Sequence, residues 1–140
     1  DELRKRRAGV APEERLPPSA YAEAESRAVH AELFAAAAAA LAAGAAVVLD
    51  AVFLDPAHRA AAESVARRAG VPFTGFWLEA PLDLLCARVA ARTGDASDAT
   101  EAVVIRAAAA DPGPVAWHRL DAAADPRAAA REALALPTGA

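Results

Sequence analysis

A short apolar run near the middle of the chain is interrupted by one carboxylate. In the stretch GAAVVLDAVFLDP, residues 44–56, Asp50 stands between two groups of apolar side chains. An apolar run without alternation is typical of a parallel strand covered on both faces, so we predict a buried strand over 47–50. A carboxylate buried without a partner would cost several kcal/mol, which favours a place for Asp50 at the end of that strand.

This position makes Asp50 a candidate functional residue. In open α/β sheets, ligands bind beyond the carboxyl ends of the strands, and Asp50 would lie at that rim. The alternative interpretation is that Asp50 only caps a turn.

The rest of the chain alternates between helix and strand patterns. Strong helix formers, with proline and glycine at helix ends, predict helices over 3–8, 21–43, 56–69, 81–92, 99–110 and 126–136. Runs of β-branched and aromatic residues predict further strands over 71–79 and 117–121. This order implies a parallel α/β sheet with right-handed crossovers, in a single domain over residues 1–140.

Composition excludes several classes of function. Alanine supplies most of the 56% apolar content, and the uncharged run 33–49 is too short to span a membrane. A net charge of −4 disfavours general nucleic-acid binding. The lone Cys86 cannot form an intrachain disulfide, which fits a reducing, cytoplasmic compartment. The histidines share no ligand spacing, so we expect no zinc site.

Two arginines have a spacing that would let them bind the same ligand. Arg88 and Arg92 are four residues apart, which places them on one face of the predicted helix 81–92. Guanidinium groups bind phosphate in a bidentate way or stack on a base. The alternative is that both are surface residues paired with acids such as Asp83 or Asp95.

Two charged segments have simpler interpretations. The segment DATE, residues 98–101, matches a capping box, with Asp98 as N-cap and Glu101 at the third helical position. The run RKRR, residues 4–7, is predicted to form a solvated helix face rather than a nucleic-acid patch.

Three stretches carry a resemblance to a known family, at 1–21, 47–59 and 71–99. They resemble predicted small-molecule kinases of the P-loop superfamily, also described as AAA-family ATPases. Some relatives are fused to an aminoglycoside-phosphotransferase-like domain, and gluconate kinases and zeta toxins are more distantly similar. The resemblance covers essentially the whole chain, and RxxxRxGDASDA, which begins at Arg88, is its most specific element.

The resemblance implies a fold and a chemistry. The fold would be a three-layer parallel sheet of the P-loop kinase type, with a lid over about 88–106 that closes on the nucleotide. ATP and Mg²⁺ would be the cofactors, and the partner would be a small-molecule acceptor. Arg88 and Arg92 would belong to the lid and shield the phosphoryl group from water.

The resemblance also implies roles for four other residues. Asp1 would be the base or ligand for the acceptor hydroxyl, although an ordinary exposed terminal residue is the alternative. Asp50 would lie near Mg²⁺, through water, or near the acceptor. Arg4 would hold an anionic acceptor, and Arg119 would neighbour the adenine.

The sequence departs from this family at the phosphate-binding loop. Its seven glycines are scattered, and no GxxxxGK(S/T) motif, the Walker A loop, is present. We therefore expect a fragment truncated at the N-terminus, lacking the first strand, this loop and the second strand, and inactive by itself. Relatives order their strands 2-3-1-4-5, so segments 47–50 and 73–79 should either pair directly or leave an apolar slot.

Three functions fit these observations. The first is the core and lid of an ATP-dependent phosphotransferase that acts on a small-molecule hydroxyl and binds ATP only with the missing loop. The second is a non-catalytic, degenerate α/β domain. The third is an ATPase-type regulator without a small-molecule acceptor.

Overall fold

The structure is a computed structural model that describes residues 1–135. The order of its elements is α1 (Glu2–Ala8), a 3-10 turn η1 (Pro18–Tyr21), α2 (Glu23–Ala42), α3 (Pro56–Ala69), β1 (Phe76–Glu79), α4 (Leu82–Ala90), α5 (Glu101–Ala109), β2 (His118–Asp121) and α6 (Arg127–Ala135). Every predicted helix is present, and two of the three predicted strands are. Helices combined with a small parallel sheet are compatible with the α/β class.

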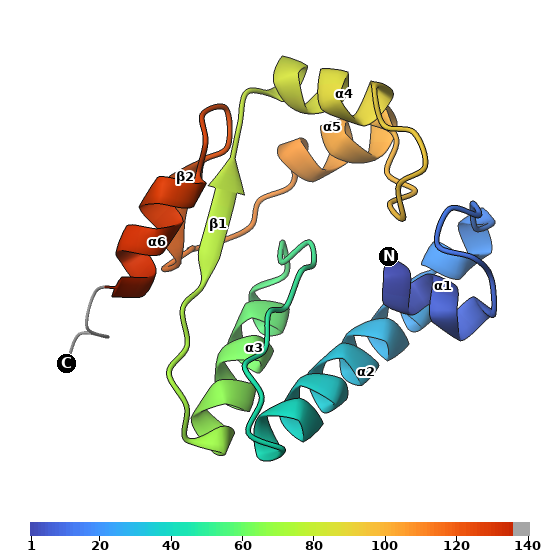
Figure 1. The fold of residues 1–140 in the computed structure, drawn as a ribbon. Helices are drawn as coiled ribbons and strands as arrows, with labels where there is room; N and C mark the ends of the chain where they lie inside the picture. Colours follow the sequence, from blue (N-terminus) through green and yellow to red (C-terminus); the bar gives the residue numbers. More distant parts are fainter. Residues whose placement is uncertain (136–140) are drawn as a thin grey trace.

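The helices α2 and α3 lie side by side and pack against each other (Figure 1). At the start of α3, the Asp55 carboxylate accepts a hydrogen bond of 2.8 Å from the backbone N–H of Ala57, which caps the helix. At its end, Gly70 adopts φ 69, a left-handed conformation that favours glycine. Apart from Arg59, the buried residues of the two helices are small: Ala37, Ala62, Val65 and Ala66.

The strands β1 and β2 pair in parallel, with Phe76 opposite His118 and Glu79 opposite Asp121. Just before the two strands begin, the Trp117 ring packs close to the backbone of Gly75. A Cβ atom on residue 75 would lie 2.3 Å from the Trp117 ring, so only glycine fits there. Phe53 and Phe73 also contact this ring, with centroids at 5.2 and 5.6 Å.

The predicted strand over 47–50 is wrong. Residues 45–50 are extended without ladder pairing, and Val48 is 93% exposed. Direct pairing of this segment with β1 is also wrong, because β2 is the only strand that pairs with β1 among the described residues. A strand is stabilised by hydrogen bonds to the backbone of a neighbouring strand, and among the described residues no strand lies in that position beside 45–50.

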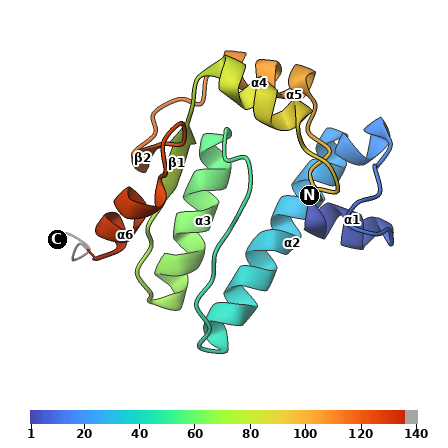
Figure 2. The same cartoon turned by 45° about the horizontal axis from the view of Figure 1, so that its top comes forward.

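The link between α2 and α3 runs alongside α3. It ends at the same end of the molecule as β1 (Figures 1 and 2). The helices α4 and α5 cross over that side in both views. Within residues 1–135, every helix is too short or too polar to cross a bilayer.

Candidate functional site

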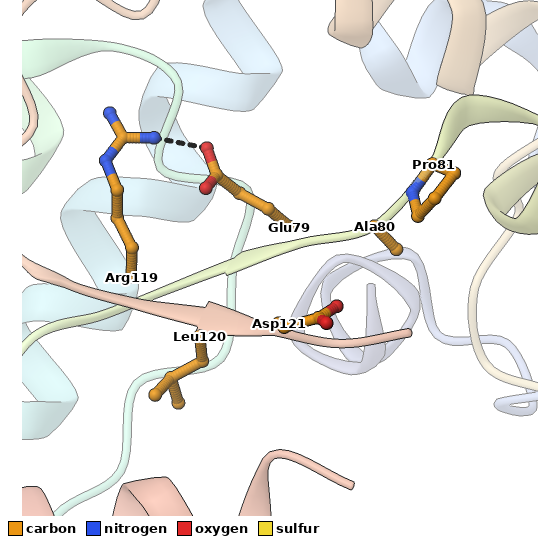
Figure 3. Close-up of a pocket in the computed structure, with 6 residues that line it drawn as sticks. All are labelled: Glu79, Ala80, Pro81, Arg119, Leu120 and Asp121. Atoms are coloured by element: carbon orange, nitrogen blue, oxygen red, sulfur yellow. Dashed lines mark hydrogen bonds and ion pairs between the residues drawn. The ribbon is translucent and has the colours of Figure 1, made fainter. Parts of the chain in front are cut away.

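The two strands end side by side at one edge of the molecule. Next to their carboxyl ends lies an open hollow of ≈ 310 Å³ (Figure 3). Its lining residues are Glu79, Ala80, Pro81, Arg119, Leu120 and Asp121. Ligands of parallel sheets bind at this edge, so the hollow is the candidate site.

Arg119 lies in the hollow as an ion-paired residue. Its guanidinium binds the Glu79 carboxylate, as the dashed line in Figure 3 marks. Glu79 also accepts a hydrogen bond of 3.2 Å from the Trp77 indole N–H. Both members of the ion pair are about half exposed, and pairs of this kind contribute at most about 1 kcal/mol. Arg119 can therefore exchange Glu79 for another partner at little cost.

Arg88 connects α4 to the same edge. Its Nη1 donates a hydrogen bond of 2.8 Å to the carbonyl of Ala122, the residue that follows β2. Arg88 thus contacts the end of β2, whereas Arg119 is the second residue of that strand. Their role in binding a nucleotide stays a prediction.

Arg92 does not share a helix face with Arg88, which corrects the sequence-based interpretation. The helix α4 ends at Ala90, two residues earlier, and the chain then turns at Gly94 with φ 64. The Nε of Arg92 lies 3.9 Å from an oxygen of Asp95, in the partly exposed pair that the alternative interpretation had named. Ala91 caps the end of α4, so Arg92 lies outside the helix.

Asp1 and Arg4 lie together at the start of α1. The Arg4 Nε is 3.8 Å from Asp1 Oδ1, and Arg4 Nη1 donates to the carbonyl of Ala20 at 2.5 Å. The guanidinium also lies 4.6 Å from the centre of the Tyr21 ring. Asp1 Oδ2 accepts a hydrogen bond of 3.2 Å from the backbone N–H of Asp98.

Asp50 is exposed and makes no hydrogen bond or ion pair within the described part of the chain. The structure therefore does not join it to Arg88, Arg119 or Asp1. Its place near a metal or acceptor stays a prediction.

The sequence-based interpretation missed a polar cluster around Asp98, in which Lys5 is buried and Tyr21 is partly exposed. Asp98 Oδ1 lies 3.0 Å from Lys5 Nζ, and Oδ2 accepts hydrogen bonds from the Tyr21 hydroxyl at 2.5 Å and the Leu16 N–H at 3.0 Å. Lys5 also donates to the carbonyl of Pro12 at 2.6 Å. We call Lys5, Leu16, Tyr21 and Asp98 the Asp98 junction.

The junction corrects two predictions. The N-cap of α5 is Thr100 rather than Asp98, whose side chain binds Lys5 instead. Lys5 is only 1% exposed, so the run 4–7 is not entirely a solvated face. One feature of the sequence could have indicated this position. Lys5 is the only lysine beside 14 arginines, and the compact ammonium of lysine is not interchangeable with a guanidinium.

The pKa values of the junction reflect this environment. Burial raises the pKa of the Asp98 carboxyl, but hydrogen bonds from Tyr21, Leu16 and Lys5 outweigh it and lower the pKa to about 2. Burial and the nearby Asp98 charge raise the pKa of Tyr21 to about 12. Near neutral pH the junction therefore holds one ionised carboxylate and one neutral phenol.

A buried arginine was also missed. Arg59 of α3 is 4% exposed and donates to four carbonyl oxygens. Its acceptors are Phe53 at 2.6 Å, Leu54 at 2.9 Å, Pro112 at 2.5 Å and Pro114 at 3.1 Å. Arg59 thereby joins the segment that follows Asp50 to the loop that precedes β2. No local sequence pattern predicts these contacts, because the acceptors are backbone carbonyl groups, which every residue has.

Parallel strands, a hollow at their carboxyl ends and arginines beside it are features of α/β proteins that bind a ligand at a sheet edge. The chain matches the family described as AAA domain over residues 1–111 and therefore belongs to it. This family is of the P-loop type, with nucleotide-binding functions of the kinase or ATPase kind. No curated protein and no solved structure matches the chain.

Nucleotide and Mg²⁺ are the groups that this family generally binds. The hollow suits the base end of a nucleotide better than its phosphates, because Glu79 and Asp121 would repel anions beside the apolar Pro81 and Leu120. Within residues 1–135, no three His, Cys, Asp or Glu side chains gather as metal ligands. Mg²⁺ would therefore be held mainly by phosphates and water, its usual partners in nucleotide sites.

Proposed function

We propose that the chain is part of an ATP-dependent phosphotransferase that acts on a hydroxyl of a small molecule. The family match over residues 1–111 carries this proposal. The placement of Arg88 at the carboxyl end of β2 supports it, since phosphoryl transfer needs positive charge near the strand ends.

In this proposal the α4–α5 unit, residues 82–109, serves as the lid. Arg119 and the hollow receive the base end of ATP, while Arg88 and Arg92 approach the phosphates. Asp1 accepts the proton of the acceptor hydroxyl and Asp50 lies near Mg²⁺ through water. These roles use exposed or weakly paired groups, which can change partners on binding.

Arg4 is proposed to hold an anionic acceptor. The Arg4 Nε makes no hydrogen bond, although it is buried and lies 3.8 Å from Asp1 Oδ1, so an acceptor that displaced Asp1 would give this donor a partner. The carbonyl of Ala20 already uses another donor.

The proposed architecture is a three-layer sheet with a further strand between segment 45–50 and β1. Val48 and Leu78, which are exposed on these two segments, would become buried by that strand. ATP binding also needs a glycine-rich loop that supplies backbone N–H groups, and the 140 residues contain no such motif. The proposal therefore concerns this chain together with a loop of that kind.

The test uses the product of the complete reading frame. We expect it to bind ATP and to phosphorylate a member of a panel of sugars, nucleosides and aminoglycosides. Arg88→Ala should lower kcat about a hundredfold or more, as expected for an arginine that stabilises phosphoryl transfer. The matched control is Arg68→Ala on the exposed face of α3, which should leave kcat unchanged. Failure of every acceptor despite ATP binding and hydrolysis would favour the ATPase-type regulator.

A degenerate, non-catalytic domain is the second candidate. The observation in its favour is that the arginines at the edge already have protein partners, Arg119 with Glu79 and Arg88 with the Ala122 carbonyl. Absence of ATP binding by the complete product would support this candidate.

A further inference from the structure

The α4–α5 unit has little apolar attachment to the rest of the molecule. Among the described residues, α4 and α5 pack chiefly against each other, and neither contains a buried residue. Val103 and Ile105 of α5 are 46% and 47% exposed. Because apolar stabilisation scales with buried area, packing alone does not fix the position of this unit.

Polar contacts attach the unit at two places instead. On the sheet side, Arg88 binds the carbonyl of Ala122. On the other side, the connection between α4 and α5 descends toward the N-terminus (Figure 1), where Asp98 binds Lys5 and Tyr21. The unit therefore bridges the sheet and the N-terminal helices.

The second attachment is the stronger one. Lys5 and Asp98 have side chains that are 1% and 9% exposed, so their ion pair is shielded from water. Each charge has further partners, the Pro12 carbonyl for Lys5 and two donors for Asp98. Removing one member of such a pair leaves a buried charge without compensation, which is strongly unfavourable.

The same residue also reaches Asp1. The Asp98 N–H donates to Asp1 Oδ2 at 3.2 Å, while the Asp98 side chain is held by Lys5 and Tyr21. The position of the α4–α5 unit and the orientation of the Asp1 carboxylate are thus set together.

We propose that Asp98 is a positioning residue, whose burial in the Asp98 junction holds the α4–α5 unit over the sheet edge and orients Asp1. The inference about the reaction rests on the proposed function, but the structural part does not. Loss of the junction should release the connection between α4 and α5 while the α2–α3 packing stays intact.

Limited trypsin digestion of the 140-residue chain tests the structural part. Cleavage after Arg92, beside the connection, is compared with cleavage after Arg67 and Arg68 in α3. Asp98→Ala should raise the rate at Arg92 about tenfold or more relative to α3, because local opening governs proteolysis and charge-assisted hydrogen bonds are lost. The matched control Glu101→Gln removes an exposed carboxylate three residues from Asp98, outside the junction and without a hydrogen bond or ion pair to Arg92.

A second variant keeps the test valid if Asp98→Ala does not fold. Tyr21→Phe removes one hydrogen bond to Asp98 without leaving a buried charge, and a smaller, selective rise at Arg92 is expected. A rise no larger than that of Glu101→Gln, or parallel increases at Arg92 and in α3, would overturn the proposal.

The product of the complete reading frame tests the link to the reaction. Asp98→Ala should lower kcat for acceptor phosphorylation and raise the ratio of ATP hydrolysis to transfer, because an unheld lid admits water. An unchanged ratio with selective cleavage at Arg92 would overturn the catalytic part of this inference. An inactive unmodified protein would count against the proposed function instead, and the digestion result would still stand.

Discussion

At the scale of single residues, the Asp98 carboxylate is predicted to control stability in acid. Its pKa is about 2 in the folded protein against an ordinary value of 3.8, so folding favours the ionised form. The resulting stabilisation is complete above about pH 4 and is lost as the pH falls toward 2. At 1.36 kcal/mol per pH unit, it amounts to roughly 2 kcal/mol.

Urea unfolding at pH 7, 4 and 2.5 measures this dependence. Asp98→Asn should have a lower free energy of unfolding at pH 7 and a flatter profile between pH 4 and 2.5. Asp95→Asn, which removes a half-exposed carboxylate, should keep the slope of the unmodified chain. Equal slopes for all three proteins would contradict the prediction.

Arg59 should be the most costly arginine to replace. Arg59→Met leaves four carbonyl oxygens without their donor, and we expect a loss of about 3 kcal/mol in the free energy of unfolding. Arg59→Lys should restore little of it, because an ammonium cannot reproduce the planar fork of donors. Arg68→Met on the exposed part of α3 is the control, and a similar loss there would contradict the prediction.

At the scale of elements, a histidine pair should make the α2–α3 contact sensitive to pH. The rings of His30 and His58 stack with centroids 3.8 Å apart, and burial followed by repulsion from His30 lowers the pKa of His58. Asp55 acts in the opposite direction but does not outweigh these effects. Folding therefore favours neutral His58, and its contribution is present above pH 6.5 and lost as the pH falls.

Titration of the histidine ring protons by NMR checks this prediction. His58 should titrate below its ordinary pKa of 6.5, and His30→Gln should raise its pKa by removing the neighbouring charge. His118 in β2, outside the stacked pair, serves as an internal reference. An unchanged His58 titration in His30→Gln would show that the stack does not shift the pKa.

The helices and strands also show where the local sequence pattern is sufficient to predict secondary structure. The helix α3 was predicted at its observed bounds, because Asp55, Pro56 and Gly70 determine its ends locally. The segment 47–50 has strand composition but no partner, so its composition did not make it a strand. Similarly, α4 ends at Ala90, so the helical spacing of Arg88 and Arg92 did not place both on one helix.

At the scale of the whole molecule, backbone stability should follow the distribution of buried residues. The helix α3 contains four of them, Arg59, Ala62, Val65 and Ala66, whereas α4 and α5 contain none. Amide hydrogen exchange should therefore be slowest in α3 and at least about tenfold faster in α4 and α5, which open locally. Equal protection across these helices would indicate one cooperative unit and contradict the prediction.

The resemblance to P-loop kinases named Arg88 and Arg119 as nucleotide-binding residues, and that role stays a prediction. The structure places Arg119 in the lining of the hollow and Arg88 against the carbonyl that follows β2. Lys5, Tyr21 and Arg59 were not identified as partners. Lys5 and Tyr21 are separated from Asp98 by 93 and 77 positions, and Arg59 binds backbone carbonyls that are the same for every residue type.

By itself, the sequence determined the family. It also determined the helices and two of the three predicted strands, because caps, propensities and apolar runs act within a few residues. Only the tertiary structure decided that Asp98 binds Lys5 instead of capping α5, and that segment 47–50 is not a strand. The physical reason is the same in both cases. A buried charge and an extended backbone each need a partner, and distant parts of the chain supply or withhold it.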